Sequence, residues 1–183
     1  MGHKRVGRDL VFRRLFEVDQ EDIGNHFRRL DTNSRRARFC GSVGDAGLTS
    51  YVRTLFRFDS ILIGAFVEGH LRGLAELRGV LHIWPSKAEA TFSVDPDWQD
   101  IGIGDALFER VVTMARNRCV RSIRLMCLME NTRMRHLATK HGARICFDQD
   151  VMEAFLHPGS PMPASVASEI IGETRWFAHL LGR

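Results

Sequence analysis

Lysine, tyrosine, closely spaced cysteines and long apolar runs are all scarce in this 183-residue sequence. No stretch approaches the roughly 18 apolar residues of a membrane-spanning helix, and the basic start is not followed by the apolar segment of a secretory signal. The cysteines form no CxxC pair, which argues against a zinc site or a disulfide framework. We therefore expect a soluble, cytoplasmic protein with no metal, no membrane partner and reduced, mostly buried cysteines, namely Cys40, Cys119, Cys127 and Cys146.

Because lysine is scarce, the positive charge lies almost entirely on arginine. The chain has 26 Lys and Arg against 22 Asp and Glu, and only Lys4, Lys87 and Lys140 are lysines. Guanidinium groups suit bidentate pairing with phosphate or carboxylate, so the composition permits an anionic ligand, although genome base composition can produce the same excess. The basic residues are scattered and no recognition element is visible, so we do not expect a nucleic-acid partner.

The hydrophobic pattern predicts one α/β domain over residues 1–183, with a core at 9–157, a Pro-rich linker at 158–164 and a closing helix at 165–183. Strands alternate with helices after an initial helical part, which indicates a mixed, largely antiparallel twisted sheet with helices on both faces. The interval 31–47 reads as a loop, and 79–87 as the end of a strand followed by a turn at 85–86. The predicted strands are 10–16, 61–67, 71–77, 88–94, 122–129, 143–148 and 151–156. One predicted helix begins at Asp19, and three others cover 48–55, 104–118 and 131–141.

The segment 94–107 (VDPDWQDIGIGDAL) carries the most informative pattern, because a strand leads through a turn into two glycines at the start of a helix. Glycine allows positive φ and a close approach of the backbone to a ligand. Backbone N–H groups at a helix N-terminus bind anions, and a diphosphate would engage several of them at once. The dinucleotide fingerprint is excluded because Leu107 replaces its third glycine, and no Gly-Lys-Ser/Thr phosphate loop occurs.

The remaining pattern, Gln-x-x-Gly-x-Gly after a strand and a proline, resembles that of the GNAT superfamily of acyl-CoA-dependent N-acetyltransferases. The likeness continues downstream through Asn131, Leu137, Ala138 and the stretch 140–143 (KHGA). Through the segment 34–39 (SRRARF), the chain also resembles the acetyltransferase domain of some bacterial protein-lysine acetyltransferases. The resemblance implies the GNAT fold, acetyl-CoA as co-substrate, and transfer of its acetyl group to a primary amine by direct attack in a ternary complex.

The resemblance also implies which residues hold the cofactor. Backbone groups of Phe92, Ser93 and Val94 would hold the pantetheine arm, Asn131 would bond to it, and Arg135 would lie near a phosphate. A helix N-cap is an equally good role for Asn131, and both can hold at once. The diphosphate would be cradled by Gln99, Asp100, Ile101, Gly102, Ile103, Gly104 and Asp105.

The chemistry needs a base for the ammonium proton and a donor for the thioester carbonyl. By resemblance, the base would be Glu89 and the donor the backbone N–H of Val94; alternatively, Glu89 is an ordinary exposed strand residue. The family's usual tyrosine acid is replaced by Ala138. Either a nearby group replaces it, the nearest in sequence being His136, Thr139 and His141, or the thiolate leaves without a protein acid.

Two parts of the chain relate to the unidentified acceptor or to assembly. We expect Arg35 and Arg36 to pair with acidic residues of neighbouring helices, whereas Arg38 and Phe39 could line the acceptor pocket. The last helix, with Trp176 and Phe177, would pack on the domain or on a second subunit, so a homodimer is one assembly that we consider. The absence of the tyrosine acid leaves a second functional hypothesis, a degenerate acyl-CoA-binding or sensing module.

Overall fold

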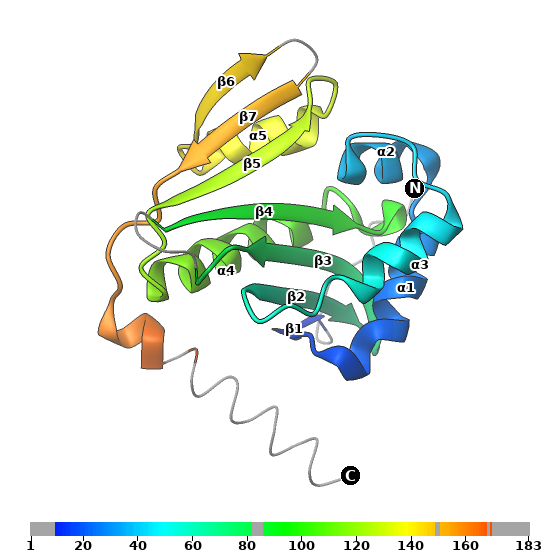
Figure 1. Ribbon diagram of the computed structural model, residues 1–183, viewed down its shortest axis with the longest axis horizontal. Coiled ribbons are helices and arrows are strands. Elements are labelled where there is room, and N and C mark those ends of the chain that lie inside the picture. Colours follow the sequence, from blue (N-terminus) through cyan, green and yellow to red (C-terminus); the bar gives the residue numbers. More distant parts are fainter. Residues whose placement is uncertain (1–9, 82–85, 149–150, 168, 170–183) are drawn as a thin grey trace, which may run out of the picture.

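The computed structural model describes residues 10–81, 86–148, 151–167 and 169. Its centre is a seven-stranded mixed sheet in the order β1-β2-β3-β4-β5-β7-β6, with helices on both faces (Figure 1). Every strand pair is antiparallel except β4–β5. The predicted fold class, a largely antiparallel mixed sheet between helices, is confirmed.

The first half of the sheet is a meander of β1 (Leu10–Arg14), β2 (Ser60–Val67), β3 (His70–Arg78) and β4 (Lys87–Val94). The β2–β3 hairpin turns through Glu68 and Gly69, whose φ angles are 51° and 76°. Two consecutive positive φ values are typical of the tight turn whose twist matches that of paired strands. The predicted strands 61–67 and 71–77 are therefore present and pair as a hairpin.

The second half contains β5 (Ser122–Leu128), β6 (Arg144–Asp148) and β7 (Val151–Leu156). β5 runs parallel to β4, and their register extends from Lys87 opposite Ser122 to Ala90 opposite Leu125. Each strand continues beyond that point for three or four residues, but the described residues form no further β4–β5 pairs. The two strands therefore separate at the carboxyl end of β4, which opens a gap in the sheet.

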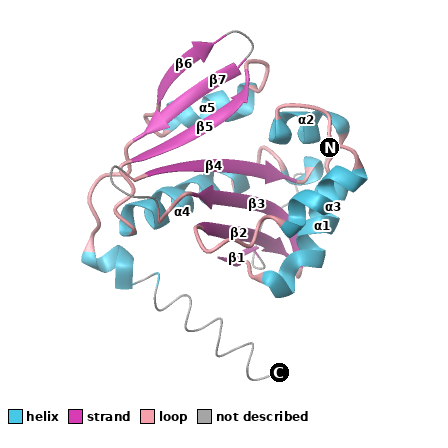
Figure 2. Ribbon diagram, in the orientation of Figure 1, coloured by secondary structure: helices cyan, strands magenta, loops and turns pink. Residues whose placement is uncertain are grey.

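Helices α4 (Ile103–Asn117) and α5 (Thr132–Lys140) cover one face, and α1 (Gln20–Arg29), α2 (Thr32–Phe39) and α3 (Asp45–Arg53) cover the other (Figure 2). Two 3-10 turns, Glu17–Asp19 and Pro96–Trp98, precede α1 and follow β4. The apolar core accordingly has two parts. One lies between the sheet and the helices α4 and α5, and the other between the sheet and the helices α1 and α3.

A glycine in β3 sets how closely α4 approaches the sheet. A Cβ atom on Gly73 would lie 2.9 Å from Ile103 Cγ2 and 3.0 Å from Leu107 Cδ1, which is closer than packed carbon atoms allow. Ile103 is the first residue of α4 and is fully buried. Gly73 therefore lets the N-terminus of α4 lie directly against β3, next to the end of β4.

Three local predictions are wrong. The interval 31–47 is not a continuous loop, because α2 begins at Thr32 and Asp31 caps it by accepting a hydrogen bond from the Ser34 N–H at 2.6 Å. Asp19 is at the N-cap of α1, but its carboxylate accepts from Arg13 and from the Phe16 N–H instead of capping the helix. The cysteines are not mostly buried, since only Cys127 is buried and Cys119 is exposed.

Parts of the predicted tail lie outside the described residues, including Trp176, Phe177 and most of the helix predicted at 165–183. Within the described residues, 163–167 are helical, and Glu169 accepts hydrogen bonds from Asn117 and pairs with Arg118 of the α4 end. No described helix is both long and apolar enough to span a bilayer, and the described residues contain no group of three potential metal ligands.

Candidate functional site

The gap between β4 and β5 leaves backbone donors at the end of β4 without a strand partner. The Asp95 N–H, just past β4, donates to the Arg72 carbonyl on the β3 side at 2.8 Å. Because successive N–H groups of a strand point to opposite edges, the N–H groups of Val94 and Phe92 face the β5 edge. At that edge the β4–β5 pairing has already ended, so Val94 presents an N–H to the gap. Ser93 differs, since the same alternation directs its backbone toward β3.

The N-terminus of α4 lies beside this gap and has the geometry of an anion site. Gly102, the N-cap, has φ 91°, and Asp100 two residues earlier has φ 59°. The N-cap carries no side-chain hydrogen bond, and the first intrahelical bond runs from the Ala106 N–H to the Gly102 carbonyl. The N–H groups of residues 103–105 therefore have no partner within the helix. Together with the helix dipole they would attract a phosphate group.

Two acidic side chains next to these N–H groups are neutralised from α5 and its C-terminal cap. Asp105 accepts from Lys140 Nζ at 2.7 Å and lies 2.8 Å from His141 Nε2, and Asp100 pairs with Arg133 at 3.0 Å. The hydrogen bond from Lys140, followed by that from His141, lowers the pKa of Asp105, and the bond from Arg133 lowers that of Asp100. Without partners, these two carboxylates would repel a diphosphate; the ion pairs neutralise their charge.

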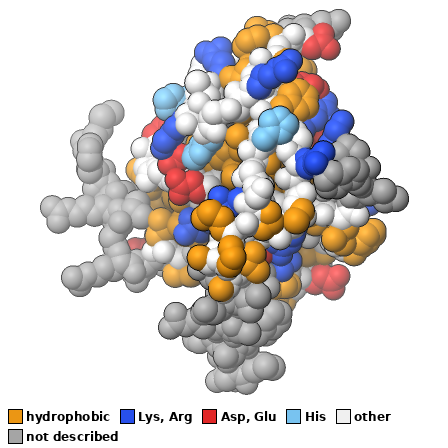
Figure 3. Space-filling model, turned by 90° about the vertical axis from the view of Figure 1, so that its left-hand side faces the viewer, with side chains coloured by type: hydrophobic (Ala, Val, Ile, Leu, Met, Phe, Trp, Pro, Cys, Tyr) orange, Lys and Arg blue, Asp and Glu red, His pale blue; other side chains and the backbone are white. Residues whose placement is uncertain are grey.

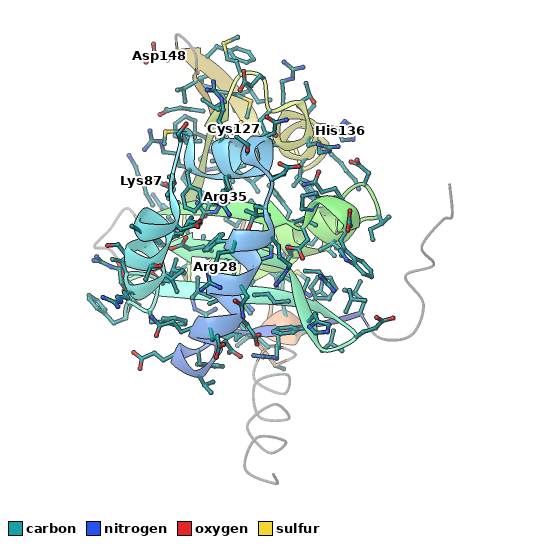
Figure 4. The ribbon with its side chains drawn as sticks, turned by 90° about the vertical axis from the view of Figure 1, so that its right-hand side faces the viewer. Arg28, Arg35, Lys87, Cys127, His136 and Asp148 are labelled. Atoms are coloured by element: carbon teal, nitrogen blue, oxygen red, sulfur yellow. The ribbon has the colours of Figure 1, made fainter. Side chains whose placement is uncertain are left out.

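Two amides at the site hold its backbone. Gln99 Nε2 donates to the Val94 carbonyl at 3.0 Å and to Ser34 Oγ at 3.2 Å, so it ties the end of β4 to α2. Asn131 caps α5 by accepting from the Met134 N–H at 3.1 Å, and its NH₂ group is left for another partner. Arg135, one turn further along α5, is exposed. Figure 4 looks onto this end of the sheet, where Arg28 marks α1, Arg35 marks α2 and His136 marks α5.

Glu89 lies on the opposite face of β4 from α4, on the side covered by α1, α2 and α3. It is in register with Arg78 of β3 and Arg124 of β5, and its carboxylate lies 3.9 Å from Arg124 Nη1. Its side chain is 44% exposed. Unlike a buried core residue, Glu89 can therefore meet a solvent-borne molecule that approaches β4 from this face.

A buried polar network lies on the same face, and the sequence did not reveal it. Glu76 is 2% exposed, and its carboxylate accepts hydrogen bonds from Arg38 at 2.9 Å, Tyr51 at 2.5 Å and Arg78. Burial raises the pKa of Tyr51 to about 12, so this hydroxyl stays protonated and donates. Tyr51 lies in the helix predicted at 48–55; its ring packs on Phe39, and its hydroxyl is part of the network.

The three arginines of α2 have different partners. Arg35 pairs with Asp45 at 3.1 Å and Arg36 with Glu130 at 2.8 Å, so both meet acidic partners near the surface. Arg38 is 5% exposed and reaches Glu76. On the face that Figure 3 shows, Lys and Arg side chains are interspersed with acidic and apolar ones and form no continuous basic stripe.

The comparisons bear on this arrangement. The Acetyltransferase (GNAT) family model matches residues 29–143, well over half of the chain. The chain belongs to the GNAT acetyltransferase family. The matched segment contains the β4–β5 gap, the Gly102 loop and α5, and acetyl transfer is the general class of activity of the family. None of the curated protein sequences matches.

Solved GNAT structures share the whole fold at low identity. The GNAT domain of S. lividans PAT superposes with a TM-score of 0.73 at 19% identity, covering 84% of this chain and 93% of that one. Spermidine N-acetyltransferase from Vibrio cholerae, solved with CoA and spermine, gives 0.65 at 20% identity, with 82% and 96% covered. A Salmonella typhimurium protein solved with its cofactor acetyl-CoA gives 0.63 at 15%, with 85% and 97% covered.

One departure from the GNAT pattern is visible in α5. Ala138 is fully buried and contributes no proton donor. The nearby groups are already engaged: His141 stacks on Phe108 with 4.4 Å between ring centroids and points Nε2 at Asp105, while Thr139 donates to the Arg135 carbonyl. His136 is exposed on α5. Thr139 and His141 are thus engaged elsewhere, whereas His136 faces solvent.

Proposed function

We propose that this GNAT protein transfers the acetyl group of acetyl-CoA to a primary amine, by direct attack of the amine in a ternary complex. The observation that carries the proposal is the separation of β4 from β5 beside the bare N-terminus of α4. One feature offers a donor to a carbonyl and the other offers donors to a diphosphate. The end of β4 and the N-terminus of α4 are close along the chain, so one extended ligand would meet both.

The fit to a CoA-type ligand rests on backbone more than on side chains. The N–H groups of residues 103–105 would bind the diphosphate, and Gly102 supplies the positive φ that turns the chain there. The Asn131 amide and the backbone of Phe92 and Val94 would hold the pantetheine arm. Gln99 would act indirectly, since it holds the Val94 carbonyl. Arg135, exposed on α5, would add a cation near a phosphate.

The transfer step would use two groups of β4. Glu89 would take the proton from the acceptor ammonium, which frees the nitrogen lone pair for attack on the thioester carbon. The Val94 N–H would donate to the carbonyl oxygen as negative charge develops on it. As the intermediate collapses, the nitrogen gives its second proton to solvent, the carbon–sulfur bond breaks and CoA leaves as a thiolate. With Ala138 in place of a tyrosine, we propose that solvent protonates this thiolate.

A second candidate is a CoA-binding or sensing module without turnover. The fully buried Ala138, with its neighbours Thr139 and His141 engaged elsewhere, is the observation that favours it. Both candidates share the cofactor site and differ in whether Glu89 performs proton transfer. Binding and turnover must therefore be measured separately.

Binding is tested by calorimetry with acetyl-CoA and CoA. We expect micromolar binding that Gly104→Glu abolishes, because the new carboxylate would fill the loop and repel phosphate; the nearest atom to a Cβ there is Val94 Cγ2 at 3.9 Å. Gly44→Glu is the matched control, because Gly44 is the N-cap of α3 and has open space around it. If Gly104→Glu folds and binds normally, the cofactor loop is misassigned.

Turnover is tested by thiol release from acetyl-CoA with a panel of small amines, polyamines and lysine peptides. Glu89→Gln should lower kcat by about 10²- to 10⁴-fold, the usual contribution of a general base. Glu130→Gln, which alters an exposed carboxylate that pairs with Arg36, should leave kcat unchanged. Binding without release by the wild type for every amine would favour the sensing module.

A further inference from the structure

A wholly buried histidine of α1 bridges the two residues that flank Val94. His26 has no exposed surface; its Nε2 lies 2.8 Å from Ser93 Oγ, and its Nδ1 lies 2.7 Å from Asp95 Oδ1, at an angle short of a well-aligned hydrogen bond. Ser93 and Asp95 are themselves buried. Because residues i and i+2 of a strand share a face, one rigid ring spans both sides of Val94.

Burial, together with two neighbouring arginines, favours a neutral His26 ring. The Asp95 carboxylate is already paired with Arg29 Nε at 2.9 Å and Arg72 Nη1 at 3.2 Å. Burial lowers the pKa of His26; Arg29 and Arg38 lower it further, and Asp95 opposes them. A neutral imidazole has one donor and one acceptor. A carboxylate only accepts, so the proton belongs on Nδ1, facing Asp95, and Nε2 accepts from the Ser93 hydroxyl.

This bridge acts on the peptide that carries the Val94 N–H. That peptide joins residues 93 and 94, and the contacts of His26 with Ser93 and Asp95 restrain the chain on both sides of it. On the other side, Gln99 holds the Val94 carbonyl at 3.0 Å, and the Asp95 N–H is bonded to β3. The strand end is thus held through the Ser93 side chain, the Val94 carbonyl and the Asp95 N–H, while the described residues form no β4–β5 pair at Val94.

We propose that His26 is a positioning residue that holds the Val94 N–H in the orientation required to bind the thioester carbonyl. The inference rests on the proposed function of Val94. His26 acts from the face opposite α4 and touches neither acceptor nor cofactor. Its contribution is to restrict the Val94 backbone before the ligand arrives, which makes the N–H a preorganised donor.

The test compares the dissociation constants of acetyl-CoA and CoA, because only acetyl-CoA has the carbonyl that Val94 would bind. We expect wild type to prefer acetyl-CoA and His26→Phe to reduce that preference by about two- to tenfold, the worth of one hydrogen bond. His26→Gln, whose side-chain oxygen can still accept from Ser93, should keep most of the preference. In turnover, His26→Phe should lower kcat while KM for the amine is unchanged.

The control is Ile23→Ala, a fully buried α1 residue in the core that α1 and α3 share. It should lower thermal stability without changing the ligand preference. An equal loss in both variants, an unchanged preference in His26→Phe, or a wild type that binds both ligands alike would overturn the positioning role. An acetyl group found on Ser93 by mass spectrometry would also overturn it, since Ser93 would then be a nucleophile. Binding of neither ligand would instead refute the proposed function.

Discussion

Removing the charge of Glu76 should destabilise the protein strongly, although it lies outside the cofactor site. Glu76→Gln keeps the shape of the side chain but leaves Arg38, 5% exposed, without its anionic partner. Breaking a buried ion pair on one side costs about 3–5 kcal/mol. Arg78 is 35% exposed and is largely compensated by water, so it adds little. We expect the lower end, about 3 kcal/mol, because the amide oxygen can still accept from Tyr51.

Urea denaturation followed by circular dichroism measures this change directly. For a chain of this size, about 3 kcal/mol corresponds to a fall in Tm of about 6–12 °C. Glu130→Gln is the control, since the Arg36–Glu130 pair has side chains 50% and 66% exposed and should contribute less than about 1 kcal/mol.

A double replacement separates the charge effect from packing. Glu76→Met combined with Arg38→Met removes both charges and should destabilise less than Glu76→Met alone, because no unpaired buried ion remains. If Glu76→Gln is as stable as wild type at an unchanged m-value, Glu76 is not a buried ionised group and the reasoning fails. If the destabilisation of the double variant equals the sum of those of the two single variants, the pairing of Glu76 with Arg38 does not stabilise the network.

Three further predictions concern the site. Gly102→Ala should lower stability by about 1–2 kcal/mol because φ is 91°, whereas Gly104→Ala, with no atom nearer than 3.9 Å, should be close to neutral in a melting experiment. Asn131→Ala should cost about 1 kcal/mol through loss of the α5 cap and should also weaken CoA binding in calorimetry; unchanged affinity would leave Asn131 a cap alone. The pKa of His26 is lowered from 6.5, so below about pH 6.5 the unfolded chain binds a proton that the folded chain does not. The free energy of unfolding should therefore fall on acidification. Urea titrations between pH 5 and 7.5 should show a smaller loss in His26→Gln.

The predictions that the structure confirms depended on short-range patterns. The β2–β3 hairpin follows from two alternating runs around a Gly-containing turn, and the Asn131 cap follows from an amide residue at the start of an apolar helix. The same dependence on short-range patterns explains why helix α2 was not predicted. Its Asp31-Thr-Asn-Ser start reads as a turn, because the residues that cap a helix are also those that form loops.

The sequence by itself determined the sheet class, from the order of its strand and helix patterns, and the glycine turn into α4. The residues that would meet a CoA-type ligand stay a prediction from the family resemblance. Tertiary structure decided which side chains are buried together. His26 meets Ser93 across 67 residues and Arg38 meets Glu76 across 38, and neither pairing has a local signal. The separation of β4 from β5 likewise depends on the register of two strands that are distant in the sequence, because α4 lies between them. A sequence pattern records the chemistry of a residue, whereas its partners are set by packing over the whole sheet.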